Sequence, residues 1–150
     1  MTKKESINQF LAPKKVAIAG ASRNNKKFGY AVFNELRQKG FDVCPVNPNT
    51  DAIDGVTCYK SVKEIPVGYE KLFIVTPKNE TNNIIQQAID KGIKHIWVQQ
   101  MSSTPESSKI ANELNVDLIE NECIFMFAEP VTSVHKFHRF IWKVFGKLPK

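Results

Sequence analysis

A short loop between two glycines has the residue types best suited to chemistry. Gly20 ends an apolar run, Gly29 follows nine residues later, and hydroxyl, amide and cationic side chains lie between them. A loop that joins a buried strand to a helix offers backbone N–H groups and the positive end of the helix dipole to an anion. The loop Gly20-Ala21-Ser22-Arg23 is therefore predicted to hold the phosphates of a nucleotide-type cofactor, with counter-charge from Arg23, Lys26 and Lys27. The alternative is a solvated turn whose glycines serve only the backbone.

The loop differs from the fingerprint of NAD-binding proteins. The pattern Gly-x-Gly-x-x-Gly is absent, because Ala21-Ser22-Arg23 follows Gly20. Asn47-Pro48-Asn49 stands at the end of the next apolar run, where NAD enzymes place an acid for the ribose hydroxyls. Without that carboxylate, a ribose that bears its own phosphate is not repelled. NADP and coenzyme A both have such a ribose, and these residues do not choose between the two.

Alternating strand and helix patterns must position this loop. Five apolar runs predict strands, at residues 15–20, 42–47, 71–76, 94–99 and 116–120. Helical patterns separate them at 28–39, at 79–91 and from 103 onward, with a turn at 54–55, a β-like piece at 56–59 and a brief helix at 61–65. Pro45 is a mild objection to a central position for the second strand. We expect an α/β domain with a Rossmann-like, doubly wound, mainly parallel five-stranded sheet and helices on both faces.

Length, charge and cysteine content narrow the class of protein. The chain has 150 residues, and its longest apolar stretches fall short of the roughly 20 residues that cross a bilayer. Residues 1–130 have 16 Lys/Arg against 15 Asp/Glu, whereas residues 131–150 have five Lys/Arg and no acid. The net charge of +6 therefore belongs to the end of the chain, and we expect no nucleic-acid partner. Three cysteines and an N-terminus unlike a signal peptide point to the cytoplasm.

Five short motifs stand in order at the C-terminal ends of the predicted strands. They are Gly20-Ala21-Ser22 with Lys27-Phe28-Gly29, Pro45-Val46-Asn47-Pro48, Val75-Thr76-Pro77, Val98-Gln99 and Asn121-x-Cys123. In this order they resemble the CoA-binding domain family, which is similar to the N-terminal domain of the succinyl-CoA synthetase α subunit. The resemblance covers about residues 10–125. Phe125-Met126-Phe127 departs from it, since a glycine-containing turn is expected there by analogy.

The resemblance implies coenzyme A, free or acylated, bound across the carboxyl ends of the strands. Its implied contacts are Gly20, Ala21, Ser22, Arg23 and Lys27 at the phosphates, Val46, Asn47 and Pro48 at the adenosine end, Thr76, Pro77 and Gln99 along the pantetheine, and Cys123 near the far end. Pro77 could instead only terminate its strand, and Gln99 could point into solvent.

The spacing of the sequence suggests no catalytic set of nucleophile, base and acid. No group of His, Cys, Asp and Glu has the spacing of metal ligands. The domain with a phosphorylated histidine and the β subunit that the synthetase needs are not found in this sequence. Cys123 is the one candidate nucleophile, as a thiol activated by a following helix, and a small buried residue is the alternative. We expect non-catalytic binding of coenzyme A. The alternatives are an NADP-dependent oxidoreductase and a dinucleotide-sensing regulatory protein.

The last residues predict a basic amphipathic helix. Its apolar stripe is Val134, Phe137, Ile141, Val144, Phe145 and Leu148, opposite Lys136, Arg139, Lys143, Lys147 and Lys150. We expect residues 1–130 to form the Rossmann-like domain, and residues 131–150 to dock on it or to make a homo-oligomer contact. Contact with an anionic membrane surface is the alternative.

Overall fold

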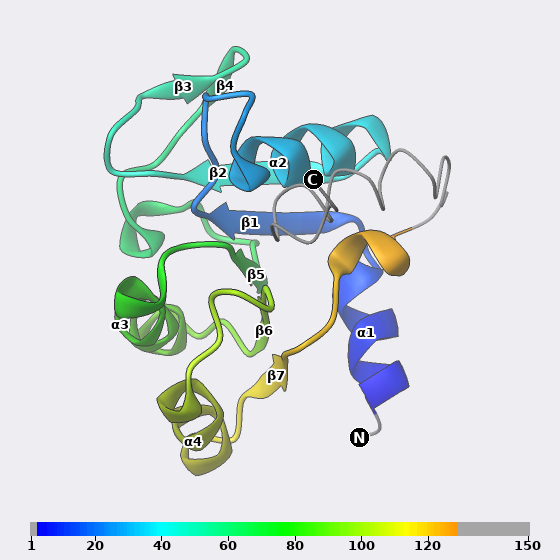
Figure 1. The fold of residues 1–150 in the computed structure, drawn as a ribbon, viewed down its shortest axis with the longest axis vertical. Helices are drawn as coiled ribbons and strands as arrows, with labels where there is room; N and C mark the ends of the chain where they lie inside the picture. The colour runs from blue at the N-terminus through cyan, green and yellow to red at the C-terminus, as the bar shows by residue number, and fades with distance from the viewer. Residues whose placement is uncertain (1–2, 129–150) are drawn as a thin grey trace, which may run out of the picture.

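The expected parallel sheet is present in the computed structural model, which describes residues 3–128 (Figure 1). Its strands are β1 (Lys15–Ala19), β2 (Asp42–Val46), β5 (Lys71–Ile74), β6 (His95–Val98) and β7 (Asp117–Ile119). They lie in the order β2-β1-β5-β6-β7, and every neighbouring pair is parallel. The predicted α/β, Rossmann-like fold class is confirmed. Each strand ends one or two residues before the predicted limit, so the motif residues lie in the loops that follow.

The second strand is at the edge of the sheet, which explains its proline. Pro45 lies beside Ile18 of β1, and among residues 3–128 the other side of β2 carries no strand, only the isolated bridge between Val46 and Tyr59. A small antiparallel hairpin follows, formed by β3 (Ala52–Ile53) and β4 (Val56–Thr57). Asp54 and Gly55 between them have φ of 47° and 78°, as a tight hairpin turn requires.

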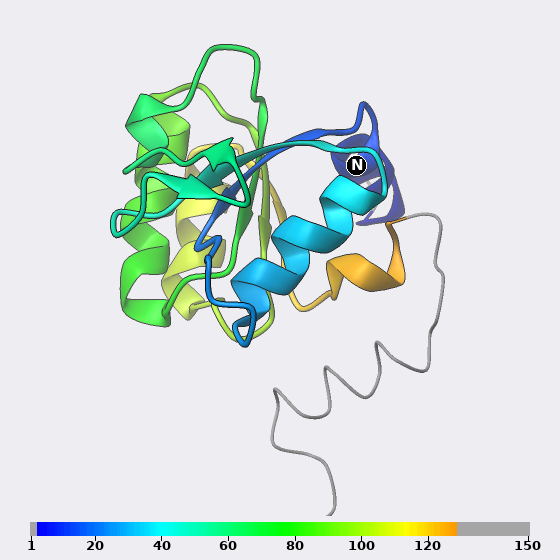
Figure 2. The same ribbon diagram turned by 90° about the horizontal axis from the view of Figure 1, so that it is seen from above.

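Helices cover both faces of the sheet (Figure 2). One face holds α1 (Lys3–Leu11), α2 (Phe28–Gln38) and the short 3-10 helix η2 (Ile124–Met126). The other holds the 3-10 helix η1 (Val62–Glu64), α3 (Lys78–Asp90) and α4 (Pro105–Glu113). Because side chains alternate along a strand, Ile18 packs on the first face, whereas Ala17 and Ala19 pack on the second.

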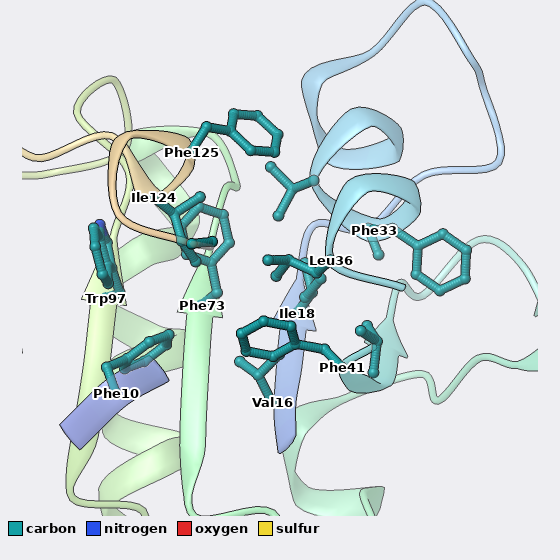
Figure 3. Close-up of a cluster of buried hydrophobic side chains, with 14 of the residues drawn as sticks. Phe10, Val16, Ile18, Phe33, Leu36, Phe41, Phe73, Trp97, Ile124 and Phe125 are labelled. Atoms are coloured by element: carbon teal, nitrogen blue, oxygen red, sulfur yellow. The ribbon is translucent and has the colours of Figure 1, made fainter. Parts of the chain in front are cut away.

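The two cores differ in composition. Aromatic rings dominate the face with α1 and α2, where Phe10 meets Trp97 edge-on at a centroid distance of 5.3 Å (Figure 3). The opposite core is aliphatic and includes Leu72, Ile74 and Ile85. Both cores cover the faces of the sheet, and the loops lie at the carboxyl ends of its strands.

Cys44 of β2 lets the burial of the aliphatic core be tested by pH. It is 3% exposed, and burial raises the pKa of its thiol to about 12. Above the unfolded pKa, the unfolded chain loses this proton while the folded chain keeps it, so stability present below pH 9 is lost as the pH rises toward 12. When the pH is raised from 9 to 10, the free energy of unfolding measured by chemical denaturation should fall by about 1 kcal/mol less in Cys44→Ala than in the wild type. Equal losses in the two proteins would contradict this expectation.

The predicted C-terminal amphipathic helix lies outside the described residues, and so do the oligomer and membrane contacts assigned to it. These stay predictions. Within residues 3–128, none of the helices combines the length and apolar character that a bilayer crossing needs.

Candidate functional site

A cavity of about 890 Å³ lies over the carboxyl ends of four strands. Its walls include the residues that follow β1, β2, β5 and β6, such as Gly20, Asn47, Thr76 and Gln99. The chain passes from β2 on one side of β1 to β5 on the other, and loops diverge at such a switch point to leave a crevice. The volume suits a small-molecule ligand, for which sites of about 300–1,000 Å³ are usual.

Two glycines allow the loop after β1 and helix α2 to come together. Gly20 has φ of +94°, and a Cβ there would stand 2.7 Å from the Val75 carbonyl oxygen. A Cβ on Gly29, in the first turn of α2, would stand 2.0 Å from the Gly20 carbonyl oxygen. These approaches exclude any side chain at either position. They bring the N-terminus of α2 directly against the end of β1.

Nested turns fix the loop between these glycines. Ser22 Oγ accepts the Asn24 N–H at 3.0 Å, and Asn24 Oδ1 accepts the Lys26 N–H at 3.0 Å. The Asn24 carbonyl accepts the Lys27 N–H at 3.0 Å. Lys27 is the N-cap of α2 and makes no side-chain capping bond. Lys26 and Lys27 therefore line the cavity where the helix dipole is positive, and both features attract an anion.

Asn47 joins the loop after β2 to the loop after β1. Its Nδ2 donates to the Ala21 carbonyl at 2.8 Å, and its Oδ1 accepts the Asn49 N–H at 2.8 Å. This side chain thus positions the two loops relative to each other. Val46 and Pro48 beside it give the cavity an apolar wall at this end.

Two buried polar side chains of the cavity wall lack hydrogen bonds of normal geometry. Thr76 and Gln99 are 8% and 2% exposed, and no such bond reaches Thr76 Oγ1 or either amide atom of Gln99, although the Gln99 amide interacts with the Cys123 thiol, a weak hydrogen-bonding group. Such groups are rare in folded proteins, because each costs the free energy of its lost hydration. The alternative that Gln99 points into solvent is wrong. A ligand with its own donor and acceptor would satisfy these atoms, so this part of the wall fits a polar cofactor.

Nine of the twelve predicted contact residues line the cavity. They are Gly20, Ser22, Lys27, Val46, Asn47, Pro48, Thr76, Pro77 and Gln99. Ala21, Arg23 and Cys123 are not among the lining residues. Ala21 is fully buried in the aromatic core, and Arg23 is exposed on the loop. Contact of these three with a cofactor stays a prediction.

Cys123 packs in the core rather than serving as an exposed thiol. It is 9% exposed and lies in the same cluster as Ile124 and Phe125. Burial raises its pKa, which opposes formation of the thiolate that exchange requires. Where a glycine turn was expected, η2 places Phe125 edge-on against Phe28 at 5.6 Å, beside the first turn of α2. The structure thus favours the small buried residue over the activated nucleophile.

Sequence reasoning missed one wall of the cavity. Helix α3 contributes Glu80, Asn83, Ile84 and Gln87, which share one face because they are spaced at i, i+3, i+4 and i+7. Lys60, Ser61 and Met101 also line the cavity. The α3 spacing was readable, but its polar residues look like an ordinary solvated helix face. The charged residues that line the cavity as a whole are three lysines, Lys26, Lys27 and Lys60, and a single acid, Glu80.

Comparison with known proteins assigns the family. A family model described as "CoA binding domain" matches residues 14–129. The chain belongs to the CoA binding domain family. A structure of a hypothetical protein from Pyrococcus horikoshii shares this fold with a TM-score of 0.79 and 31% identity, over 87% of this chain and 92% of that one. A conserved hypothetical protein from Pyrococcus furiosus matches with a TM-score of 0.72 and 34% identity, over 74% of this chain and 96% of that one.

Some relatives of this CoA binding domain are much longer proteins. The α subunit of an ADP-forming acetate–CoA ligase II from P. furiosus is 38% identical over 61% of this chain, a match that spans 20% of the subunit. An ADP-forming acetate–CoA ligase II from Archaeoglobus fulgidus is 34% identical over 69% of this chain and 16% of that protein. The chain therefore spans a fifth or less of these ligases.

Within residues 3–128, no group of three or more His, Cys, Asp and Glu is placed to hold a metal ion.

Proposed function

We propose that this chain binds coenzyme A, free or acylated, in the cavity over β1, β2, β5 and β6, without catalysing a reaction of its own. The observation that supports this most directly is a pair of buried side chains, Thr76 and Gln99, that lack hydrogen bonds of normal geometry in the wall of a cavity that also has lysines at a helix N-terminus. Coenzyme A joins a nucleotide with phosphates to an amide-containing pantetheine. The lysines suit the phosphates of the nucleotide, and the buried polar side chains suit the amides of the pantetheine.

The cavity suggests how the cofactor would lie. Lys26 and Lys27, with the N-terminus of α2, would hold the diphosphate. Val46 and Pro48 would flank the adenosine, as the sequence resemblance implies. The pantetheine amides would meet the Gln99 amide and the Thr76 hydroxyl, and thereby supply the partners that these groups lack. Within this cavity we assign no group to acid–base or nucleophilic work.

Calorimetric titration of the purified chain with coenzyme A, acetyl-CoA, NADP and ADP tests this function. We expect coenzyme A to bind with a dissociation constant well below 1 mM, and ADP, which lacks the pantetheine, to bind at least about tenfold more weakly. Binding of NADP without binding of coenzyme A would favour the oxidoreductase or the dinucleotide-sensing regulatory protein instead. Failure of coenzyme A to bind below about 1 mM would overturn the proposal.

A further inference from the structure

The three lysines of the cavity come from opposite faces of the sheet. Lys26 and Lys27 precede α2, which packs on the aromatic core. Lys60 stands two residues before Val62, which packs in the aliphatic core on the other face. In Figure 1 the segment after β4 likewise runs on the side of the sheet away from α2. A ligand in the cavity therefore meets positive charge at two separate places.

Backbone hydrogen bonds fix Lys60 beside the end of β2. Tyr59 pairs with Val46 in a parallel bridge, its N–H donates to the Pro45 carbonyl at 3.0 Å, and its carbonyl accepts the Asn47 N–H at 2.9 Å. The Lys60 N–H donates to the Glu64 carboxylate at 3.2 Å. Lys60 thus directly follows the residue that is hydrogen-bonded to Asn47, whose side chain contacts the loop after β1. Its position relative to the loop is built into the fold.

The side chain of Lys60 is available to a stronger anion than its present partner. Its Nζ lies 2.7 Å from Asp51 Oδ1, and this contact lowers the pKa of Asp51. The Asp51 side chain is 92% exposed. Water therefore competes with the ion pair between Lys60 and Asp51, and the pair is weak. A phosphate group of higher charge would displace the carboxylate, since lysine binds phosphate as a point charge.

Coenzyme A has two separate phosphate groups, the diphosphate and the 3′-phosphate on the ribose. The lysines at α2 account for the first. The residues after β2 are Asn47, Pro48 and Asn49, which neither repel nor neutralise the second. We propose that Lys60 binds the ribose 3′-phosphate and so makes the chain prefer coenzyme A to 3′-dephospho-CoA. This inference rests on the proposed function and names the group that determines its specificity.

Titration of wild type and Lys60→Gln with coenzyme A and with 3′-dephospho-CoA tests the inference. The wild type should bind coenzyme A at least about tenfold more tightly than dephospho-CoA. Lys60→Gln should bind both ligands with the affinity that the wild type shows for dephospho-CoA. The matched control is Lys63→Gln, which replaces an exposed lysine of η1 outside the cavity and should keep the wild-type preference.

A second variant serves if Lys60→Gln does not fold. Asp51→Asn removes the competing carboxylate and should increase the preference for coenzyme A about two- to threefold. Equal affinity of the wild type for the two ligands, an unchanged preference in Lys60→Gln, or an unchanged preference in Asp51→Asn would overturn the role of Lys60 and leave the proposed function standing. Absence of binding by either ligand to the wild type would overturn the proposed function itself.

Discussion

Replacing Gly29 with alanine should abolish measurable binding of coenzyme A and lower the free energy of unfolding by about 3 kcal/mol. The added Cβ would stand 2.0 Å from the Gly20 carbonyl oxygen, and neither atom belongs to a flexible side chain. Helix α2 can accept the methyl group only by moving away from the end of β1. That movement also carries Lys26 and Lys27 away from the rest of the cavity. Chemical denaturation and calorimetric titration of Gly29→Ala measure the two effects.

A glycine at the other end of α2 gives the matched control. Gly40 has φ of +86°, and a Cβ there would meet no atom within 4 Å. Gly40→Ala should therefore cost only the strain of a left-handed residue, about 1–2 kcal/mol, and leave the affinity for coenzyme A unchanged. If Gly29→Ala folded and bound like the wild type, the close approach of α2 would have no part in the site.

The strands and the position of the loop after β1 could be predicted because their signals are local. A strand buried on both faces is continuously apolar, and the residues after it must turn, so Gly20 marks the end of β1 in the sequence itself. Asp54-Gly55 likewise predicts its hairpin turn from residue type alone. Parallel strands then bring their following loops to one edge. This is why motifs far apart in the chain meet in one cavity.

Helix α1 has a weaker signal, and sequence reasoning did not find it. Only three residues of Lys3–Leu11 are buried, namely Ser6, Ile7 and Phe10. Its position depends on distant partners, since Phe10 packs on Trp97 and the Ser6 hydroxyl donates to Asp117 at 2.6 Å. A short helix fixed by contacts more than 80 residues away leaves little periodicity in its own sequence.

Side-chain direction is the part of the site that the sequence could not supply. Ala21 and Ser22 are neighbours in one motif, yet only Ser22 lines the cavity, while Ala21 packs in the core. In an irregular loop no period relates position to direction, so a motif names the segment and not its contacts. Lys60 likewise precedes η1 and lines the cavity, whereas Lys63, inside η1, is exposed. Only the hydrogen bonds of Tyr59 show that Lys60 belongs beside Asn47.

Gln99→Leu should change stability and affinity in opposite directions. The Gln99 amide is 2% exposed, makes no hydrogen bond of normal geometry and interacts with the Cys123 thiol, a weak hydrogen-bonding group, so the free protein bears much of the desolvation cost of two polar groups. Leucine has a similar size without these groups, and the free energy of unfolding should rise by about 1–3 kcal/mol. If coenzyme A supplies the missing partners, the same change should weaken its binding by at least about tenfold.

Thermal melts with and without coenzyme A make this reversal visible. Without the ligand, Gln99→Leu should have a higher melting temperature than the wild type. A ligand at a given excess raises the melting temperature more when it binds more tightly, so coenzyme A should raise that of the wild type more. The difference between the two proteins should then shrink or reverse. The neighbouring Gln100→Leu is the control: Gln100 is exposed, and loss of its hydrogen bond to the Asn121 carbonyl should lower the free energy of unfolding by about 1 kcal/mol or less and leave the affinity unchanged. A less stable Gln99→Leu would mean that the amide has partners in the free protein. A more stable variant with wild-type affinity would place the cofactor elsewhere in the cavity. Only the combination of higher stability and weaker binding shows that this buried amide is kept for the ligand.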